Sequence, residues 1–160
     1  MKNFVSILSV AALTAAFGAT AYASSPDVYV VNFRNDQSAE SQQLDRELNS
    51  AMSMVGGSAE QVIIDTSNAA KWQKGAHEAF DRDIVPVFNQ WVGLPGFAAI
   101  VDANSKQVIG CVNSSFSSAE IAEQVRAMAS RAAGNAQLST ASTRMKTTQC
   151  PAAHNTPPGS

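Results

Sequence analysis

Hydrophobic residues along the chain form two kinds of pattern, one typical of strands and one typical of helices. The nearly continuous hydrophobic run 28–33 (VYVVNF) is rich in β-branched and aromatic residues, which is typical of a strand buried on both faces of a sheet. The run 61–66 (QVIIDT) predicts a second strand. Between them, residues 38–55 place hydrophobic side chains every three or four positions, which predicts a helix with one apolar face. This order predicts a βαβ unit with two parallel strands and a right-handed crossover.

The same patterns continue in the second half of the chain. Trp72, Ala76 and Phe80 are four residues apart and predict the apolar face of a second helix. A further helical turn or two is expected in 83–91, where a proline lies near the start. We expect Trp72 and Trp91 to be core or groove-wall residues.

A hairpin and a last helix complete the predicted domain. The runs 97–102 (FAAIVD) and 106–112 (KQVIGCV) flank an Asn-Ser pair, which predicts two antiparallel strands joined by a tight turn. Ser117 and Glu120 have the spacing of a capping box and predict the start of a helix that ends at Gly134. The expected fold class is therefore α/β, with a mixed central sheet of about four strands and flanking helices.

The first 23 residues have the layout of a cleavable export signal. Lys2 provides a positive start, 4–17 is an apolar run, and Ala21-Tyr22-Ala23 places small residues where a signal peptidase cuts. The apolar run is too short and too rich in alanine for a comfortable membrane span. We therefore expect cleavage after Ala23 and a periplasmic or secreted protein without stable membrane insertion. An uncleaved anchor is the alternative.

The composition changes after the predicted last helix. Residues 135–160 are mostly Ser, Thr, Ala, Gln, Asn and Pro, and such a stretch buries too little surface to offset its ordering entropy. The sequence therefore predicts one domain over 24–134, followed by a flexible C-terminal tail over 135–160.

Charge and motif content exclude several function classes. The predicted mature chain keeps all 13 acidic residues and loses one of the 11 basic residues, so its formal charge is −3. This balance does not favour nucleic acid as a partner. The sequence has no His/Cys cluster with metal-ligand spacing and no glycine-rich phosphate loop after a strand. We expect neither a metal nor a cofactor.

Two cysteines, Cys111 and Cys150, lie in the predicted mature chain. In an exported protein such a pair is more often a structural disulfide than a reactive site. A bridge would tie the tail across the domain and stabilise it by roughly 3–4 kcal/mol. A regulatory or catalytic pair, unpaired thiols and bonds to other chains are the alternatives. Because Cys111 alternates with Ile109, both are expected on the same face of the sheet.

The predicted element order over 26–134 resembles the thioredoxin fold. The VVNF segment at 30–33 is similar to the strand that leads into the active site of exported thioredoxins. The VGLP segment at 92–95, followed by the strand 97–102, is similar to the family's segment that carries a cis-proline. The segment 108–125 resembles the family's last strand, loop and helix. The resemblance implies a thioredoxin-like three-layer sandwich.

The chain departs from this family at the reactive dithiol. Where the family has Cys-x-x-Cys at the start of the first helix, residues 38–41 read SAES. A thiol works there because the helix N-terminus lowers its pKa, whereas a hydroxyl needs an adjacent base. His77 and His154 are distant in sequence, so a Ser–His–Asp site is the less favoured alternative. We expect Ser38 to be a helix cap and Ser41 a surface residue, with no catalytic residue among them.

The resemblance also implies a role for the loop before the third strand. In the family, this loop contains a cis-proline, faces the dithiol and offers backbone hydrogen bonds to an extended substrate. For the present chain, the resemblance therefore implies a cis bond at Pro95 and a partner groove at Leu94, Pro95 and Trp91. Gly96 stands where the family often has threonine, so a purely structural loop is favoured over retained peptide binding.

Two functions from different classes follow. The favoured hypothesis is an exported, redox-inactive thioredoxin-like module that binds an envelope or secreted protein, as accessory domains of secretion and conjugation systems do. The alternative is a thiol-disulfide oxidoreductase that uses Cys111 and Cys150. A serine hydrolase built on Ser38 or Ser41 ranks third.

Overall fold

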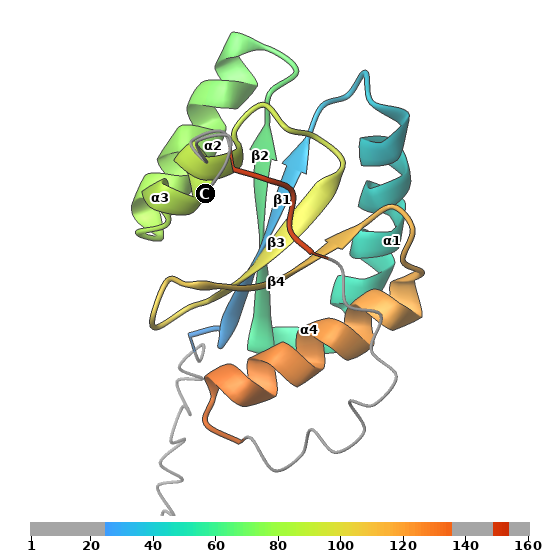
Figure 1. Cartoon of the computed structure of the whole chain (residues 1–160), viewed down its shortest axis with the longest axis vertical. Coiled ribbons are helices and arrows are strands. Elements are labelled where there is room, and N and C mark those ends of the chain that lie inside the picture. The colour runs from blue at the N-terminus through green and yellow to red at the C-terminus, as the bar shows by residue number, and fades with distance from the viewer. Residues whose placement is uncertain (1–24, 136–148, 154–160) are drawn as a thin grey trace, which may run out of the picture.

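The computed structural model describes residues 25–135 and 149–153. The predicted signal peptide and most of the predicted tail lie outside these residues, so both stay predictions. The elements follow the expected order (Figure 1). They are β1 (Val28–Arg34), α1 (Ala39–Val55), a 3-10 turn (Gly56–Ser58), β2 (Ala59–Asp65), α2 (Ala69–Asp81), α3 (Val85–Trp91), β3 (Phe97–Asp102), β4 (Val108–Asn113) and α4 (Ser118–Ala132).

The four strands form one mixed sheet with the order β2-β1-β3-β4. β1 and β2 are parallel, which confirms the predicted βαβ unit. β3 runs antiparallel to both β1 and β4. Phe33 pairs with Phe97, and Phe97 pairs with Asn113, so the end of β1, the start of β3 and the end of β4 meet at one edge of the domain. The expected α/β class with a mixed four-stranded sheet is confirmed.

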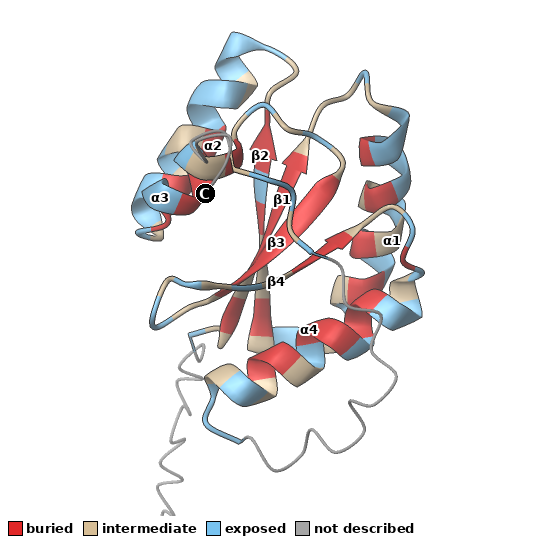
Figure 2. Cartoon of the chain, in the orientation of Figure 1, coloured by how far each residue is buried: buried red, intermediate tan, exposed pale blue. Residues whose placement is uncertain are grey.

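Helices cover both faces of this sheet (Figure 2). α1 and α4 pack against each other and against one face, where Leu44, Leu48, Ile121 and Val125 are fully buried. We call this side the α1/α4 cluster. On the other face, α2 and α3 enclose a second set of buried residues that includes Phe33, Trp91 and Phe97, here called the α2/α3 cluster. The central strands β1 and β3 are buried on both faces, which explains their nearly continuous hydrophobic runs.

Local signals in the sequence start the two longest helices. The Ser38 hydroxyl accepts a hydrogen bond from the Ser41 N–H (3.2 Å) and caps α1. At α4, Ser117 and Glu120 form the predicted capping box. Such caps satisfy backbone donors that a helix start would otherwise leave unpaired.

The prediction of which side of α2 faces the core is wrong for its two aromatic residues. The buried residues of α2 are Gly75 and Ala79, whereas Trp72 is 46% exposed and Phe80 is 74% exposed. A Cβ atom on Gly75 would lie only 3.3 Å from the Ile64 Cα atom. The helix therefore approaches the sheet through its smallest side chains, and this close packing turns the two aromatic residues away from the core.

The hairpin also differs from its prediction. The turn is longer than two residues, since β3 ends at Asp102 and β4 begins at Val108. Within the turn, the Asp102 carboxylate accepts hydrogen bonds from the N–H groups of Asn104 (2.8 Å) and Ser105 (2.9 Å). In the pairing, Val101 lies opposite Val108 and Ile100 lies opposite Gly110, which leaves Ile109 as an extra residue. Such a bulge breaks the alternation of side chains.

The bulge separates two residues that were expected on one face. Cys111 is buried in the α2/α3 cluster, whereas Ile109 is 37% exposed and lines a hollow beside α4. The prediction that Cys111 and Ile109 share a face is therefore wrong. Among the described residues, no helix has the length and hydrophobicity to cross a bilayer.

Candidate functional site

The region that the sequence singles out lies at one edge of the sheet (Figure 1). There, α1 begins after β1, and the loop 92–96 leads into β3. The Gly96 N–H donates a hydrogen bond to the Phe33 carbonyl oxygen (2.9 Å). A Cβ atom on Gly96 would lie 3.1 Å from the Glu40 Cβ atom. The loop before β3 therefore lies directly against the start of α1.

Ser38 is positioned by the helix that it caps. Its hydroxyl accepts from the Ser41 N–H and donates to the Glu40 carboxylate (3.0 Å). A hydrogen bond from the Glu40 backbone N–H, together with the one from Ser38, lowers the pKa of the Glu40 carboxyl group. Glu40 therefore carries a full negative charge near neutral pH and interacts favourably with the positive end of α1. The cap role expected for Ser38 agrees with this geometry.

Ser41 is fully buried, so its expected place on the surface is wrong. Its hydroxyl oxygen accepts a hydrogen bond from the Asn35 N–H (3.2 Å). The side chain thus points back toward the loop between β1 and α1 and fixes that loop to the helix. Hydrogen bonding to the backbone explains how a polar side chain is tolerated there.

The base beside these hydroxyls is the Glu40 carboxylate, and the described histidine, His77, does not lie next to them. The hydrogen-bond partners of the two serines are backbone N–H groups and the Glu40 carboxylate. His77 lies on α2, which packs on the sheet face opposite α1. His154 is outside the described residues. Because the pKa of the Glu40 carboxyl group is lowered, its carboxylate is a weak base and a poor activator of a serine nucleophile.

The loop before β3 carries no cis-proline. Among the described residues, no peptide bond is cis, so the expectation of a cis bond at Pro95 is wrong. Gly93 and Gly96 flank Leu94 and Pro95 and have φ values of +91° and +94°. These left-handed glycines turn the chain on both sides of the proline, and a trans bond suffices. Pro95 is exposed, and Leu94 packs partly against the α2/α3 cluster.

Replacing Gly96 with alanine tests this close approach. We expect Gly96→Ala to lower the free energy of unfolding by about 1–3 kcal/mol, because it combines a positive φ with a tight contact to Glu40. Urea denaturation measures the change. Gly93→Ala is the matched control, since Gly93 has a similar φ but no atom within 4 Å of its Cβ position. Equal losses in both variants would contradict the proposed contact.

A cluster of charged side chains surrounds the ends of β1 and β2. Arg34 forms ion pairs with Asp36, Asp45 (3.3 Å) and Asp65 (3.5 Å). Lys71, on the first turn of α2, pairs with Asp36 and Asp65 (3.1 Å). The hydrogen bond from Lys71 lowers the pKa of Asp36, and the same contact raises the pKa of Lys71.

No role was predicted for the residues of this charged cluster. The sequence does contain a signal for the cluster, because Arg34, Asp36 and Asp65 directly follow the hydrophobic cores of two runs predicted to be parallel strands. Parallel neighbouring strands end at the same edge, which brings such residues together. The position of Lys71 depends on how α2 packs across the sheet, which the sequence pattern does not give. The cluster joins β1, β2, α1 and α2 and holds this edge in place.

Acid should weaken the domain through Asp65. Burial alone would raise the pKa of this carboxyl group, but hydrogen bonds from Ser67 and Lys71 and the charge of Arg34 hold the pKa below its ordinary value. A carboxyl group with a lowered folded-state pKa stabilises the fold above its unfolded pKa, and this stability is lost as the pH falls through the folded value.

We therefore expect the free energy of unfolding to fall below about pH 4. Asp65→Asn should reduce this pH dependence, which urea titrations between pH 2 and 7 would measure. An unchanged slope in the variant would contradict a role for Asp65.

The two cysteines are joined in the structure. The Cys111 and Cys150 sulfur atoms are 2.05 Å apart. Cys111 is 1% exposed, and both cysteines belong to the α2/α3 side of the sheet, away from α1. Cys150 packs against the α2/α3 cluster with only part of its surface exposed. The structure thus pairs these residues as a bridge rather than as free thiols, and among the described residues no cysteine is free.

The bridge fixes a C-terminal strap, residues 149–153, on the domain. In Figure 1 the strap, drawn in red, passes over the strands and runs toward α3. The Trp91 Nε1–H donates a hydrogen bond to the Pro151 carbonyl oxygen (2.9 Å). Trp91 is 2% exposed and contacts the rings of Phe33 and Phe97 edge to face. Trp91 is therefore a core residue that also anchors the strap.

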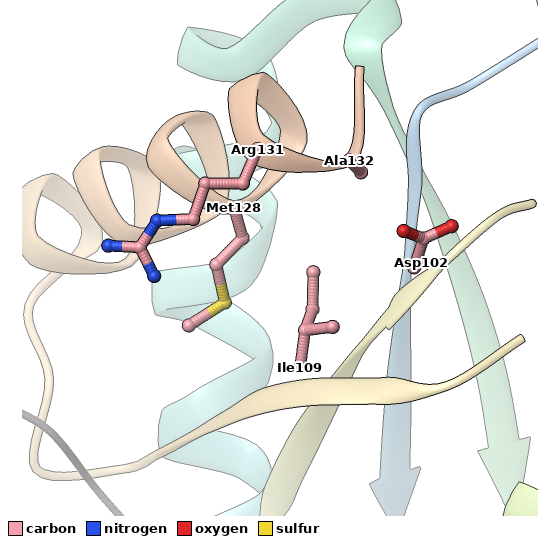
Figure 3. Close-up of a pocket in the computed structure, with 5 residues that line it drawn as sticks. All are labelled: Asp102, Ile109, Met128, Arg131 and Ala132. Carbon is pink, nitrogen blue, oxygen red and sulfur yellow. The ribbon is translucent and has the colours of Figure 1, made fainter. Parts of the chain in front are cut away.

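A hollow lies between the hairpin and the last turns of α4 (Figure 3). Its lining residues are Asp102, Ile109, Met128, Arg131 and Ala132. Asp102 already binds two N–H groups of its turn, and the hydrogen bond from Ser105 lowers the pKa of its carboxyl group. In Figure 3 the Arg131 guanidinium extends away from that carboxylate. These groups do not converge on a common point, so the hollow is not built as a charged binding site.

The described residues contain no group of three or more His, Cys, Asp or Glu side chains that could hold a metal ion. In the comparisons with known proteins, no family model, curated protein or solved structure matches the chain. The geometry described above is therefore the basis for the functional argument.

Proposed function

We propose that this chain is an exported, thioredoxin-like protein without redox activity, which binds a protein partner in the periplasm as an accessory or assembly module. Secretion and conjugation systems are one setting for such a module. The single observation that carries the proposal is the start of α1. Two hydroxyl side chains, whose hydrogen-bond partners are backbone N–H groups and the weakly basic Glu40 carboxylate, stand where the related fold would place its reactive thiols.

The thioredoxin-like part of the proposal is supported by the topology. A βαβ unit with parallel strands is followed by an antiparallel hairpin and a last helix. The strand order β2-β1-β3-β4 has β3 antiparallel to β1. The loop before β3 lies against the start of α1, as it would in such a fold. The trans bond at Pro95 is the feature that departs from it.

The absence of thiol chemistry is supported by the positions of the sulfur atoms. A reactive thiol has a depressed pKa and partial exposure, but Cys111 is 1% exposed and already bonded to Cys150. Both lie on the sheet face opposite α1, so the N-terminus of α1 does not stabilise a thiolate there. These facts disfavour the alternative of an oxidoreductase that uses Cys111 and Cys150. The bridge itself fits an oxidising compartment.

Insulin reduction in the presence of a dithiol tests the redox part. The purified chain should give no activity above background. The double variant Ser38→Cys with Ser41→Cys should gain activity, because both sulfur atoms would lie at a helix N-terminus. Ser38→Cys alone is the matched control and should stay inactive as a catalyst of disulfide exchange. Turnover by the unmodified chain that is lost in Cys111→Ser would overturn the proposal.

Photo-crosslinking tests the binding part. A photoreactive amino acid at Gln37, which is exposed beside Ser38, should give a defined adduct with one envelope protein. The same amino acid at Met54, which is 41% exposed on α1, is the control and should not. Adducts at neither site, or equally at both, would contradict a binding surface at the start of α1.

A further inference from the structure

The strap is held on the domain by its covalent bond rather than by burial. None of its residues is buried, and Gln149, Pro151 and Ala152 are exposed. The residues that it covers are different in character, because Cys111 is 1% exposed and Trp91 is 2% exposed. An exposed segment without helix or strand structure buries little apolar surface, so little free energy would keep the strap in place once the bridge is open.

The core of the domain is complete without the strap. The buried residues of the α1/α4 cluster and of the α2/α3 cluster all come from positions 28–129. Cys150 packs against the α2/α3 cluster from outside, with part of its surface exposed. A reduced Cys111 would keep its place in that cluster, because a thiol in an apolar site behaves as a small hydrophobic group. Opening the bridge should therefore release the strap and leave the domain folded.

Trp91 connects the strap to the loop before β3. Its Nε1–H donates a hydrogen bond to the Pro151 carbonyl oxygen (2.9 Å), and its own carbonyl oxygen accepts one from the Leu94 N–H (3.0 Å). Leu94 belongs to the loop 92–96 and packs partly against the α2/α3 cluster. At the end of this loop, Gly96 lies against the start of α1. The strap therefore holds the residue from which the loop at the candidate site begins.

We propose that the Cys111–Cys150 bridge is a redox latch on the candidate site. While the bridge is closed, the strap fixes Trp91 and, through it, the loop 92–96. When a dithiol protein of the same compartment reduces the bridge, the strap leaves the sheet and the loop gains mobility. The latch itself is independent of the proposed function. Its consequence, a changed affinity for a partner at the start of α1, rests on that function.

The reduction proceeds by thiol–disulfide exchange, with the chain as the substrate and not the catalyst. Cys150 is the partly exposed member of the pair, so a thiolate of the dithiol protein attacks its sulfur atom and forms a mixed disulfide. The bond to Cys111 breaks, and the Cys111 sulfur leaves with the electron pair and takes up a proton. The second thiolate of the dithiol protein then attacks the mixed disulfide and releases Cys150, which is protonated as well. The chain gains two thiols, and the dithiol protein is oxidised to a disulfide.

Tryptophan fluorescence of a Trp72→Phe variant tests the release of the strap, because Trp91 is then the only tryptophan of the chain. We expect reduced thioredoxin to open the bridge without denaturant, as measured by alkylation of the two cysteines and mass spectrometry. The emission should shift to longer wavelength as Trp91 meets water, while the far-UV circular dichroism stays the same. The matched control adds Cys111→Ser and Cys150→Ser to this variant. It should emit at the longer wavelength from the start and should not respond to thioredoxin.

Nitrogen-15 relaxation of the backbone tests the link from the strap to the loop. In the oxidised chain, the order parameter of the Leu94 amide should be near about 0.85, and reduction should lower it below about 0.6. Val125 is the internal control and should keep its value, because α4 covers the other face of the sheet. Neither measurement uses a partner, so failure of the latch is distinguishable from failure of the proposed function.

Four results would overturn the inference. The first is a bridge that reduced thioredoxin opens only in denaturant. The second is an opened bridge with unchanged Trp91 emission, which would mean that the strap stays in place. The third is loss of the far-UV signal on reduction, which would make the bridge a requirement of the fold. The fourth is a Leu94 order parameter that is the same in both redox states.

Discussion

Trp91→Ala should lower the free energy of unfolding by about 3–5 kcal/mol, the range for removing a buried tryptophan. Trp91 is 2% exposed and lies between the α2/α3 cluster and the strap. Its removal takes away two edge-to-face ring contacts, with Phe33 and Phe97, and leaves the Pro151 carbonyl without its donor. Urea denaturation followed by far-UV circular dichroism measures the loss.

Trp91→Phe separates packing from hydrogen bonding. Phenylalanine keeps an aromatic ring in the cluster but cannot donate to Pro151, so we expect a smaller loss of roughly 1–2 kcal/mol. Trp72→Ala is the control for the loss of a tryptophan outside the core, because Trp72 is half exposed. A Trp72→Ala variant as unstable as Trp91→Ala would contradict the assignment of Trp91 as the core anchor.

Removing the disulfide should cost about 2–4 kcal/mol. The bridge closes a loop between residues that are 39 positions apart, and opening it gives the unfolded chain more freedom. It also releases the strap that covers Trp91. For a chain of this size, we expect the melting temperature of Cys150→Ala to fall by roughly 10 °C. Differential scanning calorimetry of the oxidised protein and the variant measures this.

Reductant provides the matched control for that experiment. Dithiothreitol should lower the melting temperature of the unmodified chain toward that of Cys150→Ala. It should not affect the double variant Cys111→Ala with Cys150→Ala, which has no sulfur atoms left to reduce. If the unmodified chain melts at the same temperature with and without reductant, the bridge does not stabilise the fold.

The elements that depend on local patterns could be predicted from the sequence. The β1 and β3 runs, the two serine caps and the parallel βαβ unit follow from hydrophobic spacing and capping chemistry, which act within one element. These features also brought Ser38 and the loop around Pro95 to the same edge of the sheet. The class of fold was therefore accessible from local rules, whereas the position of the candidate site was implied by the resemblance to the thioredoxin fold.

The errors arise where one element approaches another. α2 packs through Gly75, and this contact with Ile64 reverses which side of the helix is buried. The bulge at Ile109 depends on the register between β3 and β4, so residue alternation alone placed Cys111 wrongly. At Pro95, flanking glycines at positive φ replaced the expected cis bond. Each of these three features depends on how the backbones of two neighbouring segments fit together. The periodicity of hydrophobic residues in a single sequence does not reveal this fit.

The strap gives the molecule an unusual response to cleavage. Arg144 and Lys146 are trypsin sites that lie between Cys111 and Cys150 in the sequence. If the backbone is cut there, the strap is no longer continuous with α4, yet the sulfur bridge still attaches it to β4. A nicked molecule should therefore run as one species on a non-reducing gel and lose its last residues only when reductant is added. Proteolysis in that stretch would not by itself expose Trp91.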